Sequence, residues 1–299
     1  MGVDIDISLI VNSVSHVKKN YVEYLKAIFI YYVLAIGITL GLSLLDAYIN
    51  TKVSMSSACC FSGLYYILTF LISFWFALVL GEFIRRNAKK FTSSITDVMK
   101  DMLKGDWLTL LIRYAVGLIV FYIVAGIVIG IPLMVFVNSI IWNIIQDITH
   151  AMTAGATYHE MLEGPHTSGV ALGIVILATI VFLPMLTTWA SMILYRVLDR
   201  KKIGEVIKTI KAGFSIPGWV YGLINILYGI IIWIIAIVVV MGLGLAFGMI
   251  SNGIGTTLGF VIGGLILILL LPFIGAVPLD FMYRVYLKFY KPKPAKANK

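Results

Sequence analysis

The chain has 299 residues, of which 61% are hydrophobic and only 12% are charged, and its net charge is +9. A soluble globular protein has about 45–50% apolar and about 25% charged residues, so this composition excludes a water-soluble domain. Apolar runs of about 20 residues, the length that crosses a bilayer, also exclude a disordered or fibrous chain. The sequence therefore predicts an all-α, polytopic integral membrane protein, with neither nucleic acid nor a soluble cofactor as a partner.

The N-terminal region predicts a short amphipathic helix followed by a transmembrane hairpin. No basic region or cleavage site precedes the first long apolar run, so we expect no removable signal peptide. Apolar residues recur with helical spacing at positions 7, 10, 11, 14 and 17. Tyr21 then stands where the chain is expected to enter the bilayer, the depth at which aromatic rings gather. Spans are predicted at residues 25–45 and 61–83.

Cys59 and Cys60 are the only cysteines, and they are adjacent in the sequence. A trans peptide holds adjacent Cα atoms about 3.8 Å apart, whereas the usual disulfide range starts near about 4.4 Å. We therefore interpret them as two small apolar residues at the entrance of the second span.

The second part of the chain repeats this order of elements. The second span ends in Glu82 and Arg85, and apolar residues at positions 95, 98, 99 and 102 predict another amphipathic helix. Trp107 leads into a third span at residues 108–136. This span is longer than a perpendicular crossing needs, and Pro132 predicts an irregular outer end.

The most polar segment between two spans covers residues 138–168. Isoleucines at positions 140, 141, 144, 145 and 148 share one helical face, which predicts an interfacial helix on the outer leaflet. The candidate metal ligands of this segment are His150, His159, Glu163 and His166. A site of two histidines and one carboxylate is geometrically feasible, because His159 and Glu163 are one helical turn apart. A solvated extracellular loop explains the same residues, and Glu163 replaces the second histidine of a His-Glu-x-x-His motif, so we predict no bound metal.

The C-terminal part predicts spans at residues 170–194, 220–248 and 258–281. Before the fifth span, apolar residues at positions 203, 206, 207, 210 and 214 predict a third amphipathic helix, and Trp219 follows it. Glycines at positions 244, 248, 259 and 263 have four-residue spacing, which predicts close packing of the last two spans. Residues 291–299 alternate proline and lysine and predict a basic, disordered tail near the lipid surface.

The distribution of positive charge predicts the topology. Of the 23 basic residues, 22 fall within residues 18–26, 85–113, 196–211 and 284–299, and Lys52 is the exception. The positive-inside rule places these four groups on the cytoplasmic side. We therefore expect a multi-pass protein of the cell membrane with both termini in the cytoplasm, in contact with anionic lipid headgroups.

The order of elements predicts three tandem modules. Each has an amphipathic helix, an aromatic anchor and a transmembrane hairpin whose C-terminal end, the basic exit, carries an arginine. The anchors are Tyr21, Trp107 and Trp219. The modules cover about residues 7–86, 91–196 and 203–284 of a single membrane domain, residues 1–290. Because each module has two spans, all three have the same orientation, and any symmetry axis lies along the membrane normal. The alternative is that any hairpin protein with a positive-inside bias shows this pattern.

The sequence between residues 80 and 107 carries a resemblance to a known family. It reads Leu80-Gly81-Glu82-Phe83-Ile84-Arg85-Arg86, then an amphipathic segment, then Asp106-Trp107 at the start of the next span. This pattern is similar to that of an uncharacterised prokaryotic family, mainly archaeal, of multi-span membrane proteins built from repeated hairpins. The resemblance covers the middle two thirds of the chain. It implies the fold only, because the family has no assigned activity or functional residues.

Charged residues are rare inside the predicted spans and lie near the basic ends. A charge buried in hydrocarbon costs about 3 kcal/mol or more, so such residues are functional candidates. Glu82, Arg113 and Asp280 lie within about two turns of a predicted cytoplasmic end. One interpretation is that they snorkel or pair with the basic exits. The other is a polar cytoplasmic vestibule where the three modules converge, lined by Glu82, Arg85, Arg113, Arg196, Asp280 and Arg284.

The sequence predicts no catalytic residue, no cofactor and no enzyme activity. The first functional hypothesis is a permease-like or transport-associated component that docks other membrane subunits or a soluble cytoplasmic partner. Since no carboxylate lies at mid-membrane, a proton- or sodium-coupled carrier is disfavoured. The alternative is a non-catalytic scaffold whose surface helices bind anionic lipid or organise membrane proteins. A metal-dependent membrane enzyme that uses the outer histidines and Glu163 ranks third.

Overall fold

The computed structural model describes residues 5–52, 55–154, 168–250 and 253–290, and each regular element among them is a helix. Six of these helices are long and apolar enough to cross a membrane, which confirms the six predicted spans. They are Tyr21–Leu45, Tyr66–Asn87, Trp107–Asn138, Leu172–Leu198, Ile216–Met249 and Gly255–Tyr290. The chain is therefore an all-α, multi-pass membrane protein.

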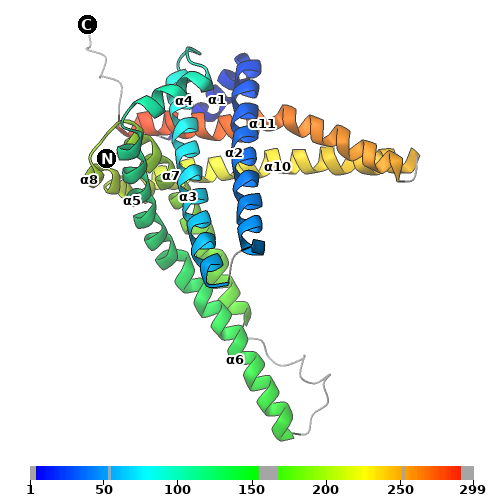
Figure 1. Ribbon diagram of the computed structural model, residues 1–299. Coiled ribbons are helices and arrows are strands. Elements are labelled where there is room, and N and C mark those ends of the chain that lie inside the picture. Colours follow the sequence, from blue (N-terminus) through cyan, green and yellow to red (C-terminus); the bar gives the residue numbers. More distant parts are fainter. Residues whose placement is uncertain (1–4, 53–54, 155–167, 251–252, 291–299) are drawn as a thin grey trace.

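The spans form three hairpins (Figure 1). The first consists of α2 (Tyr21–Lys52) and α3 (Met55–Asn87), and the third consists of α10 (Ile216–Ile250) and α11 (Ile254–Tyr290). In the second hairpin, α5 (Trp107–Ala125), the π-helical turn η1 (Gly126–Gly130) and α6 (Ile131–Ala154) form one long rod, and α7 (Ser168–Leu198) returns beside it.

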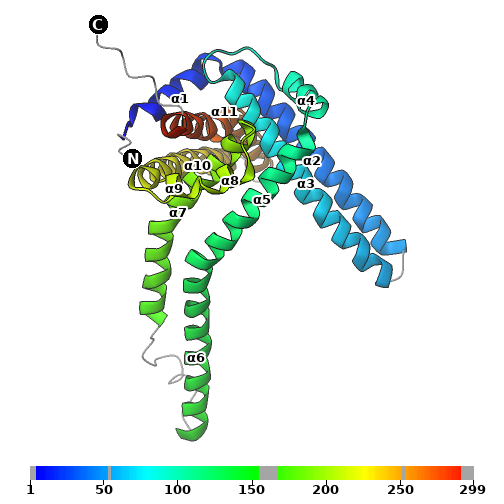
Figure 2. The ribbon, with the colours of Figure 1, turned by 90° about the vertical axis from the view of Figure 1, so that its left-hand side faces the viewer.

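The three hairpins share one end and diverge from it. In Figure 1, α2 and α3 point downward, α6 runs obliquely downward, and α10 and α11 cross toward the right. Figure 2 looks nearly along α10 and α11 and shows the other two hairpins leaving the common base in different directions. The hairpins therefore do not form one parallel bundle, and the packed core is confined to their common base.

We call this base the hub. It consists of residues 78–87 of α3, 186–198 of α7 and 276–290 of α11, together with the short helices that cover them. Large side chains from different hairpins are fully buried there, among them Tyr24 of α2, Phe83 of α3, Trp189 of α7 and Phe281 of α11. Burial of such aromatic rings supplies the main apolar contribution to holding the hairpins together.

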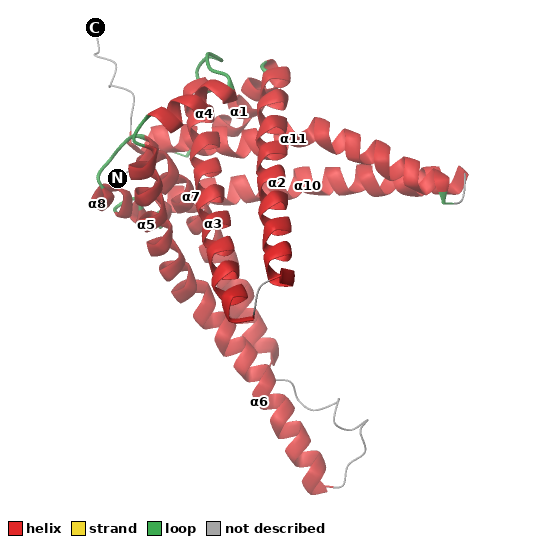
Figure 3. Cartoon of the chain, viewed as in Figure 1, coloured by secondary structure: helices red, strands yellow, loops and turns green. Residues whose placement is uncertain are grey.

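The first two predicted amphipathic helices are confirmed as α1 (Ser8–Lys19) and α4 (Ile95–Lys104). Val17 of α1 and Val98 of α4 are completely buried against the hub. Helix α4 begins at a capping interaction, because the hydroxyl oxygen of Ser94 accepts a hydrogen bond from the backbone N–H of Asp97 at 3.1 Å. Short loops join these surface helices to the spans (Figure 3).

The prediction that residues 203–214 form one amphipathic helix is wrong. The segment forms two short helices, α8 (Ile203–Ile207) and α9 (Ile210–Gly213). Thr209 between them is buried, and its hydroxyl donates to the carbonyl oxygen of Val206 at 2.5 Å and accepts from Nε1 of Trp189 at 3.1 Å. The segment packs against α7, where the buried indole N–H of Trp189 requires an acceptor. Thr209 provides this acceptor at the point where the helix is interrupted.

The predicted irregularity of the third span is confirmed, whereas the predicted separate outer helix is wrong. The π-helical turn Gly126–Gly130 lies just before Pro132, which lacks a backbone N–H. Beyond Pro132, α6 continues without interruption to Ala154, so residues 138–148 extend the span helix. Residues 133–154 contain neither glycine nor proline, and nothing in them stops the helix.

Glycines allow the close helix packing that was predicted for the last hairpin. A Cβ at Gly244 would lie 2.9 Å from the ring of Phe260, and one at Gly259 would overlap the carbonyl oxygen of Leu243. A second close approach occurs at the hub, where a Cβ on Gly222 of α10 would overlap the carbonyl oxygen of Pro184 in α7. Only glycine lets α10 cross α7 at this distance.

We expect Gly222→Ala to lower the stability of the protein, because the added methyl group must push α10 away from α7. Such overpacking typically costs about 1–3 kcal/mol. Gly229→Ala is the matched control, since it lies in the same helix and a Cβ there meets nothing within 4 Å. Thermal unfolding in detergent measures both, and equal unfolding temperatures for the two variants would contradict this account of the α7–α10 crossing.

Candidate functional site

Glu82 is the centre of a charged cluster at the C-terminal end of α3. Its side chain is buried, and its carboxylate accepts hydrogen bonds from Arg85 at 2.6 and 2.8 Å and from Nε of Arg86 at 2.8 Å. Both arginines face Glu82 because they follow it by three and four residues on a helix. Arg86 also donates to Asp101 of α4 at 2.7 Å, so the cluster fastens a surface helix to the hairpin.

A second buried carboxylate, Asp280, lies near the end of α11. Arg284 follows it by one helical turn and donates to it from Nε at 2.7 Å. The Nη2 atom of Arg284 also donates to the backbone carbonyl of Ala88 at 3.0 Å. This arginine therefore joins the end of the third hairpin to the segment that follows the first.

The two remaining vestibule candidates belong to the second hairpin. Arg196 of α7 donates to Glu205 of α8 at 2.9 Å, and its guanidinium lies 4.6 Å from the ring centroid of Tyr290. Nη1 of Arg113 in α5 donates to the carbonyl oxygens of Arg200 at 3.1 Å and Lys201 at 3.3 Å, just after α7 ends. The structure thus places all six candidates around the hub. The four arginines each contact a second element, whereas Glu82 and Asp280 pair with arginines of their own helices.

An ion pair links the C-terminal end of each hairpin, which we call its exit, to a surface segment. Arg86 pairs with Asp101 of α4, Arg196 pairs with Glu205 of α8, and Nζ of Lys288 lies 3.9 Å from Asp6 before α1. The third link joins the last hairpin to the start of the first, so the three links close a ring. The first two pairs are separated by 15 and 9 residues, which means that the contacts recur without a common sequence register.

The predicted aromatic anchors lie at the starts of spans and are half-buried. The hydroxyl of Tyr21 donates to the carbonyl of Leu269 in α11 at 2.6 Å, and Nε1 of Trp219 donates to the carbonyl of Ile180 in α7 at 3.4 Å. Trp107 is the first residue of α5 and lines a pocket. Two of the three rings therefore also connect neighbouring spans.

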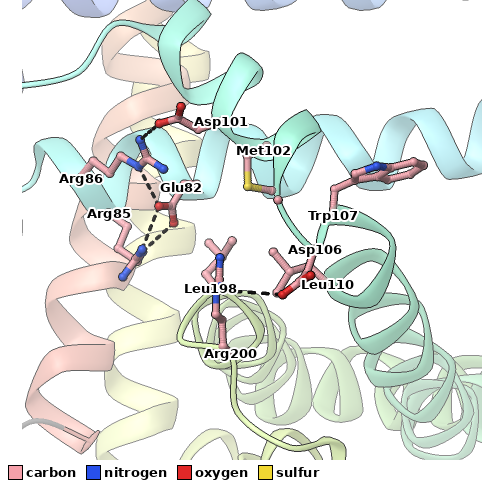
Figure 4. A pocket seen from close by; sticks show the side chains of 11 residues that line it. Glu82, Arg85, Arg86, Asp101, Met102, Asp106, Trp107, Leu110, Leu198 and Arg200 are labelled. Atoms are coloured by element: carbon pink, nitrogen blue, oxygen red, sulfur yellow. Dashed lines mark hydrogen bonds and ion pairs between the residues drawn. The ribbon is translucent and has the colours of Figure 1, made fainter.

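That pocket, of about 120 Å³, lies between α3, α4, the start of α5 and the end of α7 (Figure 4). The Glu82 cluster and Asp101 lie on one side of it, and Asp106 and Arg200 lie on the other. The apolar residues that complete its lining include Met102, Leu110 and Leu198. Sequence reasoning missed Asp101, Asp106 and Arg200, because each lies in a surface segment where a charged residue is ordinary.

The outer histidine and glutamate candidates are only partly described. His159, Glu163 and His166 lie outside the described residues, and His150 lies in α6. Across residues 5–52, 55–154, 168–250 and 253–290, no group of three or more histidine, cysteine, aspartate or glutamate side chains is arranged to hold a metal ion. The absence of a metal site in the outer loop stays a prediction.

His16 of α1 is a half-buried titratable group outside the spans that interacts electrostatically with Asp280 and Arg284 of α11. Its Nε2 lies 3.1 Å from the hydroxyl of Tyr24. Burial lowers the pKa of His16, Arg284 and Lys19 lower it further, and Asp280 opposes them by raising it. The imidazole is therefore held in its neutral form near pH 7. At the other end of α1, hydrogen bonds from Ser8 lower the pKa of Asp6.

The chain matches no known protein-family model, no curated protein and no solved structure.

We expect Glu82→Gln to destabilise the protein strongly, since Arg85 and Arg86 lose the buried carboxylate that they share and keep only Asp199 at 3.6 Å and Asp101 at 2.7 Å. Removal of one partner from a buried ion pair typically costs about 3–5 kcal/mol. Glu23→Gln is the control, because Glu23 pairs with Lys26 at 3.0 Å on an exposed surface, where a pair contributes at most about 1 kcal/mol. Unfolding temperatures in detergent test this, and similar losses for the two variants would show that the hub does not depend on Glu82.

A pH dependence should follow from the lowered pKa of His16. The folded-state pKa lies below the unfolded value of about 6.5, so the unfolded chain takes up the proton first. The stability from neutral His16 is fully present above about pH 6.5 and is lost as the pH falls toward the folded-state pKa. Unfolding temperatures of the wild type and His16→Gln at pH 7.5, 6.5 and 5.5 measure this. Parallel decreases in the two proteins would rule out His16 as the group responsible.

Proposed function

We propose that the protein is a non-catalytic membrane scaffold, in which the hub holds three apolar hairpins apart so that other membrane subunits pack against them. The divergence of the hairpins from one base is the observation that carries this proposal (Figures 1 and 2). It favours the alternative hypothesis from the sequence over the permease-like one.

Exposed apolar surface on α2 supports this function. Residues 36–41 of α2 are all exposed, and this stretch is longer than one helical turn, so every face of the helix is uncovered there. Further side chains more than half exposed occur on the other hairpins, at Ile123 of α5 and Ile234 of α10. In a bilayer these faces contact either lipid or protein, and divergent hairpins leave space for protein between them.

The ion pairs of the charged residues also favour a scaffold over a permease. A permease needs polar groups along a passage between its spans. The six vestibule candidates instead form ion pairs and backbone contacts within the hub, with Glu82 and Asp280 buried among arginines. Such pairs fix the relative positions of helices, which is what a scaffold base requires.

The proposal includes the predicted topology, with both termini and the hub in the cytoplasm, and the three-module organisation. The ring of exit contacts supports the modules, and the clustering of positive charge supports the orientation. The resemblance to an uncharacterised, mainly archaeal prokaryotic family is compatible with this function and adds no activity to it.

Site-specific photo-crosslinking in native membranes tests the scaffold function. A photoreactive residue in place of Val33 or Ile38 of α2 should crosslink to the same membrane proteins, and these should co-purify with the chain in fixed stoichiometry. Lys100 on the exposed face of α4 is the control position, because it lies outside the candidate spans. Crosslinks to lipid alone from both α2 positions would contradict the proposal. A soluble ATPase crosslinked from Lys100 would instead support the transport hypothesis.

A further inference from the structure

Arg200 has an unusual backbone conformation at the pocket between α3, α4, α5 and α7. Its φ of 57° makes it the one non-glycine residue with a positive φ in the described part of the chain. The backbone N–H of Arg200 donates to the carbonyl of Val197 at 2.8 Å, and that of Lys201 donates to the carbonyl of Arg196 at 3.3 Å. This pair of bonds is the Schellman motif, in which glycine is usual because it has no Cβ to strain the left-handed conformation. An arginine in this strained conformation points to a role for its side chain.

The guanidinium of Arg200 forms one long, exposed ion pair and no side-chain hydrogen bond among the described residues. Its nearest carboxylate is Asp106 at 3.8 Å, beyond hydrogen-bond distance, and the two side chains are 68% and 75% exposed. Arg86 across the pocket differs, because it donates to Glu82 and Asp101 at 2.8 and 2.7 Å. The pocket therefore presents one donor and one acceptor whose ion pair, drawn as a dashed line in Figure 4, is too long for a hydrogen bond.

The surroundings of this pair combine charge with apolar surface. Glu82 and Asp101 line the pocket as well, but their carboxylates are engaged by Arg85 and Arg86. Lys104 at the end of α4 and Lys201 and Lys202 after α7 are exposed and add positive potential nearby. The pocket lies where the candidate spans ending at Asn87 and Leu198 stop and the span beginning at Trp107 starts. A bilayer crossed by these spans would have its lipid headgroups at this level.

We propose that this pocket binds a phosphate ester that carries a neighbouring hydroxyl or amine. Arg200 donates to the phosphate oxygens, for which its planar fork of N–H groups is suited, and Asp106 accepts from the hydroxyl or amine. The same chemistry occurs in a phospholipid headgroup and in a soluble phosphate ester. This site does not depend on the scaffold function.

Binding by the purified full-length protein in a neutral detergent tests the site. The probes are short-chain dihexanoyl phosphatidylglycerol and free glycerol phosphate, and the dissociation constant of each is measured by titration. Tighter binding of the lipid assigns the site to a headgroup, and tighter binding of glycerol phosphate assigns it to a soluble ester. Binding of neither probe overturns the proposal.

The decisive variant is Arg200→Gly. It relieves the left-handed strain, so its unfolding temperature without ligand should equal or exceed that of the wild type. Its affinity for the preferred probe should fall about tenfold or more, the usual effect of losing a charge-assisted hydrogen bond. Arg200→Gln keeps the Cβ and should show the same loss of affinity, whereas Lys201→Gln, beside the pocket but not in its lining, should bind within about twofold of the wild type. Unchanged affinity in both Arg200 variants, or an equal loss in Lys201→Gln, overturns the proposal.

Discussion

Two buried carboxylates, each paired with an arginine on its own helix, hold the arrangement of this protein together. Glu82 of α3 and Asp280 of α11 are tolerated inside the hub only because neighbouring guanidinium groups compensate their charge. The same arginines use their remaining N–H groups on other elements, Arg86 on α4 and Arg284 on the segment after α3. Each pair thus compensates a buried charge and fastens its span helix to another segment of the chain, and the apolar core closes around them.

The parts of the fold that sequence reasoning predicted are those set by local hydropathy. The six spans and the helices α1 and α4 follow from apolar run length and helical periodicity, which depend on no distant contact. The break between α8 and α9 could not be predicted, because Trp189, about 20 residues earlier, imposes it through Thr209. The divergence of the hairpins was hidden for a similar reason, since it depends on crossings such as that of Gly222 over Pro184.

In the candidate site too, contacts within one helix were predictable from the sequence, whereas contacts between residues far apart in the sequence were not. Glu82, Arg113 and Asp280 stood out because a charge near an apolar run is costly, and the partners of Glu82 and Asp280 within one helical turn were predictable from their spacing. The contact of Arg113 with the end of α7 joins residues 87 positions apart and had no signal in the sequence. Arg200 was missed because a charged residue after a helix is ordinary, and only its positive φ makes it exceptional.

The contact between Lys288 and Asp6 brings the two ends of the membrane domain together. The backbone N–H of Asp6 also donates to the hydroxyl of Tyr221 at 2.9 Å, so the start of α1 lies against both helices of the last hairpin. With the two ends of the membrane domain adjacent, the ring of hairpins has no structurally unique starting point. The order of the hairpins along the chain can therefore change without a change in their arrangement in space. A circular permutation that joined these ends and opened the chain before α4 would preserve all three exit contacts of the ring.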